Sequence, residues 1–203
     1  MPDFEIELGI PGLVAGIDEA GRGPWAGPVV AAAVILDRAR LPAGIDDSKK
    51  LTAKKRDALY DAIMDTAMVG IGEASVAEID RLNILQATFL AMKRALAALP
   101  VRPDHALVDG NRLPPLDIRA SAIVRGDARS LSIAAASIIA KTWRDRLMTK
   151  LAEKHPDYGW ERNAGYGTAA HARALALVGI SDFHRKSFAP IRKLMTQDSD
   201  PTD

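Results

Sequence analysis

The sequence predicts an α/β core followed by a small helical appendage. Two apolar strand patterns come first, and strand and helix patterns then alternate as far as about residue 155, the order expected of helices packed on a sheet. Only helical patterns follow, and the chain ends in a polar, acidic segment. We therefore expect one domain over residues 1–155 and an appendage over residues 156–203 with a disordered tail.

Short apolar segments bounded by glycine, proline or polar residues predict the strands of the first half. Residues 14–18 are expected to form a buried strand that stops at the glycine-rich turn of residues 21–24. Residues 29–36 are apolar nearly throughout, as in a strand covered on both faces. Residues 52–67 predict a helix, since threonine is a good cap at its start, and residues 68–75 predict the next strand.

The second half alternates helices with two further strands. Apolar residues recur at spacings of four and three over residues 83–99, which marks one face of a helix ended by the prolines beyond it. The remaining predicted elements are strands over residues 106–109 and 118–124, helices over residues 130–154 and 168–178, and a disordered tail over residues 197–203.

Composition excludes several classes of protein. The 203 residues include no cysteine, which removes disulfides, thiolate zinc sites and cysteine nucleophiles. The N-terminus lacks the basic stretch and apolar core of a secretory signal, and the apolar runs at residues 29–36 and 131–140 are too short to cross a bilayer. We expect a soluble, cytoplasmic protein without a membrane partner, acting as a monomer.

Positive charge is clustered, although the formal net charge is only +1. One cluster lies in the first third of the chain and the other near its C-terminus. Their members are Lys49, Lys50, Lys54, Lys55 and Arg56, and then Arg185, Lys186, Arg192 and Lys193. Each cluster can be an ordinary solvated face or a surface that contacts phosphates, and a charge run alone does not distinguish the two.

Acidic side chains at the borders of buried segments suggest a metal site. They are Asp18 and Glu19 at the end of the first strand, Asp109 at the end of a later strand, and Asp127 before a long helix. Taken singly, they could be loop acids, a turn residue and a helix N-terminal acid. Around one cleft they would repel one another unless a hard divalent cation such as Mg²⁺ lay among them.

Short motifs occur in order along most of the chain. They are Gly16–Pro24, Gly27–Ala33, Asp47–Leu51, Val108–Gly110, Gly126–Asp127, Ser132–Ile138, Gly165–Thr168 and His184–Phe188. The set resembles the type 2 ribonucleases H (ribonuclease HII) over roughly residues 13–190. Each fragment alone is weak, but the ordered set with compatible spacing is specific.

The resemblance implies a ribonuclease H-like fold, with a central mixed sheet flanked by helices, and an enzyme that cuts the RNA strand of RNA–DNA hybrids. It implies that the catalytic and metal-binding residues are Asp18, Glu19, Asp109 and Asp127. These would hold two Mg²⁺ or Mn²⁺ ions, and the products would carry 3′-hydroxyl and 5′-phosphate ends. DNA duplexes with embedded single ribonucleotides, cut on the 5′ side of the ribonucleotide, are the second expected substrate.

Discrimination against DNA requires a sensor of the 2′-hydroxyl group. By the resemblance, the backbone of Gly21, Arg22 and Gly23 contacts that hydroxyl, and Tyr166 hydrogen-bonds there and packs against the next sugar. Without the resemblance, Tyr166 would be interpreted as a loop aromatic packed on the appendage. The candidate phosphate contacts are Lys49, Lys50 and Asn83.

The chain departs from the family pattern just before Gly165. Family members often carry a lysine there, and this chain has Ala164. A phosphate contact is then absent or moved to Arg162, which bears on hybrid binding and leaves the chemistry untouched. Structural roles are expected for His171 and His184, and no sliding-clamp-binding motif is found over residues 190–203.

Three other functions are weighed against this one. A type 3 ribonuclease H usually carries an extra N-terminal domain and a glutamate in the place of Asp127, and this chain has neither. A non-catalytic hybrid-binding module would gain nothing from carboxylates that face phosphates. A polynucleotidyl transferase such as an integrase shares the fold and the metals, but needs strand-joining machinery and usually more domains.

Overall fold

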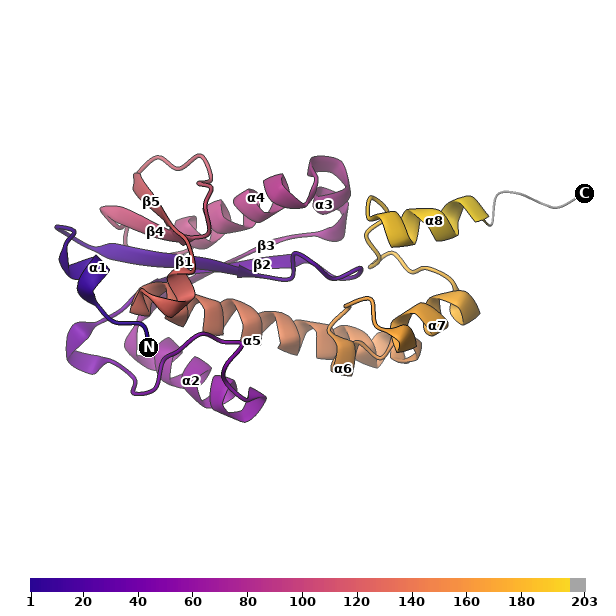
Figure 1. Ribbon diagram of the computed structural model, residues 1–203, viewed down its shortest axis with the longest axis horizontal. Coiled ribbons are helices and arrows are strands. Elements are labelled where there is room, and N and C mark those ends of the chain that lie inside the picture. Colours follow the sequence, from indigo (N-terminus) through magenta and orange to yellow (C-terminus); the bar gives the residue numbers. More distant parts are fainter. Residues whose placement is uncertain (198–203) are drawn as a thin grey trace, which may run out of the picture.

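The computed structural model describes residues 1–197, and a five-stranded mixed sheet lies at its centre (Figure 1). The strands are β1 (Val14–Ala20), β2 (Val29–Ile35), β3 (Met68–Ala74), β4 (His105–Asp109) and β5 (Arg119–Ile123), in the spatial order β3-β2-β1-β4-β5. β2 pairs antiparallel with both β1 and β3, whereas β4 pairs parallel with both β1 and β5. The predicted α/β class is therefore confirmed, and β1 is the middle strand.

Helices cover both faces of this sheet. They are α1 (Glu5–Leu8), α2 (Ala53–Thr66), α3 (Val76–Leu82), α4 (Ile84–Ala97), α5 (Leu131–Lys154), α6 (Trp160–Asn163), α7 (Ala169–Val178) and α8 (Ala189–Gln197). In Figure 1, α3 and α4 lie on one face, α5 and α2 on the other, and α6, α7 and α8 gather at one end. Short 3₁₀ turns occur at Arg38–Arg40, Gly126–Ala128 and Pro156–Tyr158.

β2 is buried over its whole length because both of its faces are covered. Ala31 and Ala33 belong to the hydrophobic cluster beneath α4, whereas Ala32 and Val34 belong to the cluster beneath α5 and α2. The alternation follows from the period of two along a strand. The prediction of a strand covered on both faces is confirmed.

α5 crosses β1 closely at Gly16. A side chain at that position would overlap the backbone of Ser132 and Ile133, so only glycine permits this approach. The helix begins after Ser130, whose hydroxyl accepts a hydrogen bond from the Ile133 N–H at 3.2 Å. The buried Glu7 carboxylate accepts the Ser132 N–H at 2.9 Å, and negative charge is favourable at a helix N-terminus. These contacts fix the helix that passes beside the candidate site.

The residues after 155 build a third hydrophobic cluster on the C-terminal half of α5. Met148 of α5 meets Trp160, Leu175 and Ile191, and Ala26 joins them from the connection between β1 and β2. The division into a domain over residues 1–155 and an appendage stays a prediction. Of the predicted tail, residue 197 is the last of α8, and residues 198–203 lie outside the described residues.

Several element boundaries differ from the predictions. β1 runs two residues beyond Asp18, to Ala20. Ser75 was predicted to end a strand, but it caps α3, because its hydroxyl and the Glu78 carboxylate bind each other's backbone N–H groups. α1, α3 and α8 were not predicted at all. None of the helices in residues 1–197 has the length and apolar character needed to cross a bilayer.

Candidate active site

Asp18 and Glu19 lie near the C-terminal end of β1, and their side chains point to opposite faces of the sheet. Asp18 lies against Ser137 of α5, whereas Glu19 lies towards Leu85 and Thr88 of α4. Because β1 continues through both residues, the backbone bends only after Ala20. Both carboxylates nevertheless line one cavity of about 260 Å³.

Asp109 also lines this cavity, and Asp127 lies next to it, close to Asp109 and Lys49. β1 and β4 are parallel, with Ile17 opposite Val108, so the next residues, Asp18 and Asp109, are neighbours. The Gly126 N–H donates to Asp109 Oδ1 at 2.7 Å, and the 3₁₀ turn that begins at Gly126 carries the buried Asp127. Three distant segments of the chain thus meet at the carboxyl ends of β1 and β4.

The electrostatics of these acids are unfavourable without a cation. Burial raises the pKa of Asp18 well above its ordinary value, and the charges of Glu19 and Asp109 raise it further. Burial also raises the pKa of Glu19, against the opposing effect of Arg22, whose guanidinium lies 3.3 Å from Glu19 Oε1. The pKa of Asp109 is raised mainly by burial, although the Gly126 N–H opposes this. Ionised carboxylates are held here at a cost in folding free energy, which a bound cation would offset.

The donor set fits a hard divalent cation. Every candidate ligand is a carboxylate oxygen, which Mg²⁺ and Mn²⁺ prefer over nitrogen or sulfur. Within residues 1–197, no group of three or more histidine or acidic side chains is spaced to hold a metal ion as it stands. The fit therefore rests on the chemistry of the ligands and on the cavity that Asp18, Glu19 and Asp109 share, and the carboxylates must draw together around an ion.

Two buried arginines bind carbonyl groups of the turn of Gly21, Arg22 and Gly23 and of the segments beside it, and neither forms an ion pair with any of residues 1–197. Arg185 donates to the carbonyl groups of Gly21, Arg22 and Gly27 at 2.6–3.0 Å. Arg144 of α5 donates to the carbonyl groups of Ala26, Pro28 and Ala164 at 2.9–3.0 Å. Burial lowers the pKa of Arg185 to about 9 and that of Arg144 to about 10, so both remain charged at neutral pH.

Only glycine fits at position 21 beneath these two arginines, whose hydrogen bonds to the backbone we call the arginine clamp. The φ of Gly21 is +94°, and a side chain there would overlap the Arg144 side chain. The carbonyl groups of Gly21 and Arg22, within the turn, are occupied by Arg185 donors. This leaves the N–H groups of the turn as backbone donors for a ligand in the cavity.

The two arginines were not recognised as site residues from the sequence. Arg185 was placed in a basic cluster, as part of a solvated face or a phosphate-contacting surface, but its side chain is 0% exposed and serves neither purpose. Arg144 did carry a signal. It falls four residues after Ala140 and four before Met148, on the buried stripe of α5, and an arginine on such a stripe requires buried hydrogen-bond acceptors.

Arg185→Gln is expected to destabilise the protein, because it leaves buried carbonyl groups without donors. The loss should be at least about 2 kcal/mol, which corresponds to a fall in Tm of about 4–8 °C for a chain of this size. The neighbouring Lys186→Gln is the matched control, since Lys186 is exposed. Thermal unfolding of both variants measures the difference, and equal Tm values would contradict the clamp.

Tyr166 lies at the edge of the same cavity, with its side chain 45% exposed. Its ring faces Gly23, where an added Cβ would lie 3.5 Å from Tyr166 Cε1. The neighbouring Gly165 carbonyl accepts the Trp25 N–H at 2.8 Å, so the tyrosine loop and the segment after the glycine turn are joined. The Tyr166 ring lines the cavity and is not part of the hydrophobic cluster of the appendage.

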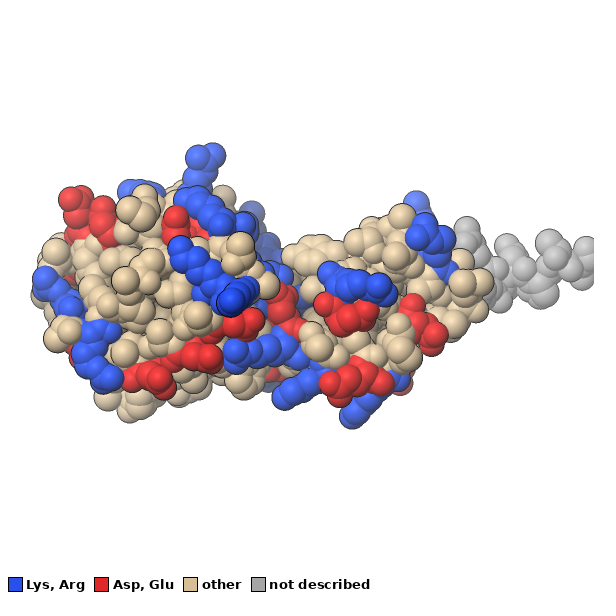
Figure 2. Space-filling model, turned by 90° about the horizontal axis from the view of Figure 1, so that it is seen from below, with Lys and Arg blue, Asp and Glu red and all other residues tan. Residues whose placement is uncertain are grey.

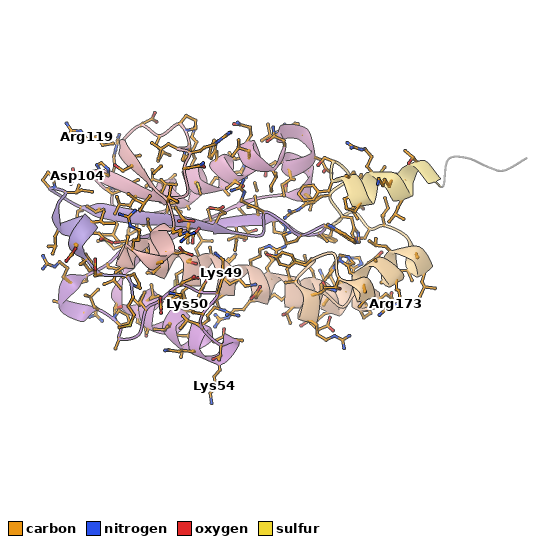
Figure 3. The ribbon with its side chains drawn as sticks, in the orientation of Figure 1. Lys49, Lys50, Lys54, Asp104, Arg119 and Arg173 are labelled. Carbon is orange, nitrogen blue, oxygen red and sulfur yellow. The ribbon has the colours of Figure 1, made fainter. Side chains whose placement is uncertain are left out.

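Basic side chains near the cavity come from several parts of the chain. On the face drawn in Figure 2, lysines and arginines are concentrated between the wide and the narrow part, with acidic side chains among them. Lys49 lines the cavity, and its Nζ lies 3.4 Å from Asp127 Oδ2. In Figure 3, Lys49 lies beside α5, whereas Lys54 points away from it beyond α2. The first basic cluster is therefore split, and Lys49 is the member that faces the acids.

The other candidate phosphate contacts have partners within the protein. Lys50 lies 3.2 Å from Asp46 Oδ1. Asn83 has a φ of +71° and caps α4, since its side-chain oxygen accepts the N–H groups of Leu85 and Gln86. Arg162, the possible substitute for the lysine absent at Ala164, lies 2.9 Å from Glu161 Oε1 on the surface. Their roles towards a substrate stay predictions.

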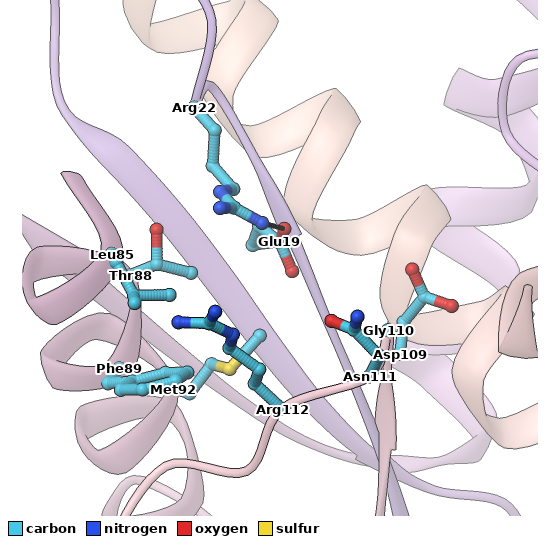
Figure 4. A pocket seen from close by; sticks show the side chains of 10 residues that line it. All are labelled: Glu19, Arg22, Leu85, Thr88, Phe89, Met92, Asp109, Gly110, Asn111 and Arg112. Carbon is cyan, nitrogen blue, oxygen red and sulfur yellow. Dashed lines mark hydrogen bonds and ion pairs between the residues drawn. The ribbon is translucent and has the colours of Figure 1, made fainter. Parts of the chain in front are cut away.

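A second cavity lies on the other side of Glu19 and Asp109 (Figure 4). Leu85, Phe89 and Met92 of α4 give it an apolar wall, and Arg112 reaches across it from the loop after β4. Arg112 makes no ion pair with any of residues 1–197. Sequence reasoning did not single out this residue, because an arginine in a polar loop is not distinctive.

Comparison with known proteins agrees with this geometry. The model of the family described as ribonuclease HII matches residues 15–191. The ribonuclease HII of Jannaschia sp. (strain CCS1) is 60% identical over 195 residues, which cover 96% of this chain and 98% of that protein. The ribonuclease HII of Paramagnetospirillum magneticum (strain ATCC 700264 / AMB-1) is 59% identical over 199 residues, which cover 96% and 99%.

A solved structure has a similar fold. The crystal structure of the ribonuclease H2 from Pyrococcus horikoshii OT3 superimposes with a TM-score of 0.77 at 27% sequence identity. The superposition covers 93% of this chain and 99% of that one. The ribonuclease H-like fold implied by the sequence motifs is thereby confirmed.

Proposed function

Since this chain belongs to the ribonuclease HII family and is an endonuclease acting on RNA–DNA hybrids, we propose that it also cuts on the 5′ side of a single ribonucleotide embedded in duplex DNA. The observation that carries the proposal is one cavity lined by Asp18, Glu19, the glycine turn and Tyr166. A group that can sense a 2′-hydroxyl and one that can contact the next sugar then flank the acids. One ribonucleotide followed by DNA satisfies both.

The acids are proposed to hold two Mg²⁺ or Mn²⁺ ions. Asp18, Glu19, Asp109 and Asp127 would be the ligands. Such ions, when bound, lower the pKa of an attacking water molecule and stabilise the leaving oxygen. The protein's own part is to hold the carboxylates at the ends of β1 and β4 and, through Arg22, to limit the negative charge at Glu19. The products would carry 3′-hydroxyl and 5′-phosphate ends.

Recognition of the ribose is proposed to rest on the glycine turn and Tyr166. The turn offers N–H groups because Arg144 and Arg185 occupy the neighbouring carbonyl groups. The Tyr166 ring can pack on the next sugar and favour a deoxyribose over a ribose there, because the ribose adds a hydroxyl group. Lys49, Lys50 and Asn83 are proposed phosphate contacts, with Lys49 nearest to the acids.

The test is cleavage of a DNA duplex with one embedded ribonucleotide. We expect one cut, which leaves the ribonucleotide at the 5′ end of the downstream fragment. EDTA should abolish the cut, and Mg²⁺ or Mn²⁺ should restore it, because the candidate ligands are carboxylate oxygens. An all-DNA duplex of the same sequence is the control. An enzyme that cuts continuous RNA in a hybrid but ignores the lone ribonucleotide would refute the proposal, and turnover undiminished in EDTA would refute the metal mechanism.

A further inference from the structure

Two histidines outside the cavity form a hydrogen-bonded chain that ends on the backbone of Tyr166. His184 and His171 are both 0% exposed, and their Nε2 atoms lie 3.0 Å apart. His171 Nδ1 lies 2.9 Å from the Tyr166 carbonyl oxygen. At the other end, the Ser181 N–H donates to His184 Nδ1 at 2.9 Å.

Only one placement of the ring hydrogens satisfies every contact in this chain. His184 Nδ1 accepts from Ser181, so the hydrogen of His184 is on Nε2 and is donated to His171 Nε2. The hydrogen of His171 is then on Nδ1 and is donated to the Tyr166 carbonyl group. The Trp160 Nε1–H also points to His171 Nε2, at 3.3 Å, which agrees with an acceptor there. Each ring carries one hydrogen, so both histidines are neutral.

The surroundings keep the pair neutral and fixed. Trp25, Tyr158 and Trp160 pack around the two rings, with the Tyr158 and His184 ring centroids 4.7 Å apart. Burial lowers the pKa of His171 and lowers that of His184 to about 4, so neither ring gains a proton near neutral pH. The titratable side chains around them are His155, Tyr158 and Tyr166.

Further contacts restrict the backbone conformation of the loop that carries Tyr166. A side chain at Gly167 would overlap the Trp25 ring, and the Thr168 N–H also donates to the Tyr166 carbonyl oxygen, at 2.8 Å. The carbonyl group held by His171 belongs to the residue whose ring lines the cavity. This carbonyl group and the ring share the Tyr166 Cα, so a displacement of the carbonyl group shifts the Cα and with it the ring that faces Gly23.

We propose that His171 and His184 are positioning residues, which set the direction of the Tyr166 side chain through its carbonyl group and so adjust the choice between substrates. His171 is the direct contact, and His184 holds it in the required tautomer. Neither residue touches the substrate. The proposal rests on the proposed function of Tyr166 as the contact to the sugar after the ribonucleotide.

Two substitutions at His171 separate this role from a merely structural one. In His171→Asn, the amide Nδ2 takes the place of Nδ1–H and can still donate to the Tyr166 carbonyl group. In His171→Gln, the amide lies near the position of Nε2, and that donor is lost. The glutamine amide oxygen can still accept from His184 Nε2, so each variant keeps one of the two hydrogen bonds of the His171 ring, and Tm should fall to a similar extent in both.

The readout is the ratio of kcat/KM on a single-ribonucleotide duplex to kcat/KM on a continuous hybrid. His171→Gln should lower this ratio about tenfold, as expected for one lost hydrogen bond, whereas His171→Asn should stay within about threefold of the wild type. Equal ratios in the two variants, with losses that follow Tm, would overturn the proposal in favour of a structural role.

A second measurement is independent of the substrate. The chain has 3 tyrosines, so fluorotyrosine labelling gives a simple ¹⁹F spectrum in which Tyr166→Phe identifies the Tyr166 signal. That signal should move in His171→Gln and stay in place in His171→Asn. An unmoved signal in His171→Gln would overturn the proposal even if the wild type cuts single ribonucleotides. If the signal moves but the wild type does not cut at single ribonucleotides, the proposed function is contradicted and the positioning role of His171 is not.

Discussion

Asp18→Asn is expected to lower cleavage of an RNA–DNA hybrid by more than about a hundredfold, because a proposed metal ligand loses its charge. Loss of a partner of a metal ligand already reduces affinity or activity by about 10- to 100-fold, and loss of a ligand itself should do more. Asp109→Asn should behave in the same way, since Asp109 lies beside Asp18 across the parallel pair of β1 and β4. Initial rates at saturating Mg²⁺ measure the effect.

The same substitution should not destabilise the metal-free protein. Burial raises the pKa of Asp18 well above its ordinary value, so between these two values the folded chain binds the proton more tightly than the unfolded chain. Stability is therefore lost as the pH rises through this window, and ionised Asp18 opposes folding at neutral pH. In EDTA, the Tm of Asp18→Asn should equal or exceed that of the wild type.

The control for both measurements is Asp57→Asn. Asp57 is an acid of α2 that lies 3.0 Å from Arg146 on the surface, away from the cavity. Its activity and Tm should remain near those of the wild type. Full activity of Asp18→Asn with unchanged metal dependence would remove Asp18 from the mechanism.

Tyr166→Ala is expected to reduce cleavage at a single ribonucleotide by about ten- to a hundredfold. A lost hydrogen bond to a buried polar group costs about 1–3 kcal/mol, and about 1.4 kcal/mol corresponds to one decade in rate. The loss on a continuous hybrid should be smaller, because the glycine turn still meets a 2′-hydroxyl there. Cleavage of the two substrates by the variant and the wild type gives the comparison.

Tyr166→Phe separates the two contributions of this residue. It keeps the ring that faces Gly23 and removes only the hydroxyl group. If ring packing on the sugar dominates, Tyr166→Phe should retain most of the activity that Tyr166→Ala loses. Equal losses of Tyr166→Ala on the two substrates would mean that Tyr166 does not distinguish them.

The strands of the sheet and the acids at its edge could be predicted, because short stretches of sequence indicate them. The apolar run at residues 29–36 indicated a strand covered on both faces, and β2 is one. Thr52 was predicted to cap a helix, and it accepts the Lys55 N–H at 3.3 Å. Asp109 was predicted at a strand end, where the edge of a sheet brings together residues that are far apart in the chain.

The support of the site could not be predicted, because it depends on contacts between distant segments. Arg185 lies among other basic residues in the sequence, and only the fold shows that its partners are backbone carbonyl groups some 160 positions earlier. α8 was missed because it is short, with few apolar residues, although Ile191 and Leu194 pack into the third hydrophobic cluster. The bonding of His171 likewise requires that residues 166, 171 and 184 meet, and nothing in their spacing indicates this.

The arginine that binds the carbonyl groups of the glycine turn is translated long after the turn itself. A ribosome releases Asp18, Glu19, Asp109 and Asp127 well before it reaches the codon for Arg185, and domains generally fold from the N-terminus during synthesis. A nascent chain of 155 residues already carries all four acids, but it lacks the guanidinium that donates to the carbonyl groups of Gly21 and Arg22, and the loop that bears Tyr166. The growing polypeptide thus carries the proposed metal ligands before it carries the arginine that holds the glycine turn and the tyrosine proposed to contact the sugar.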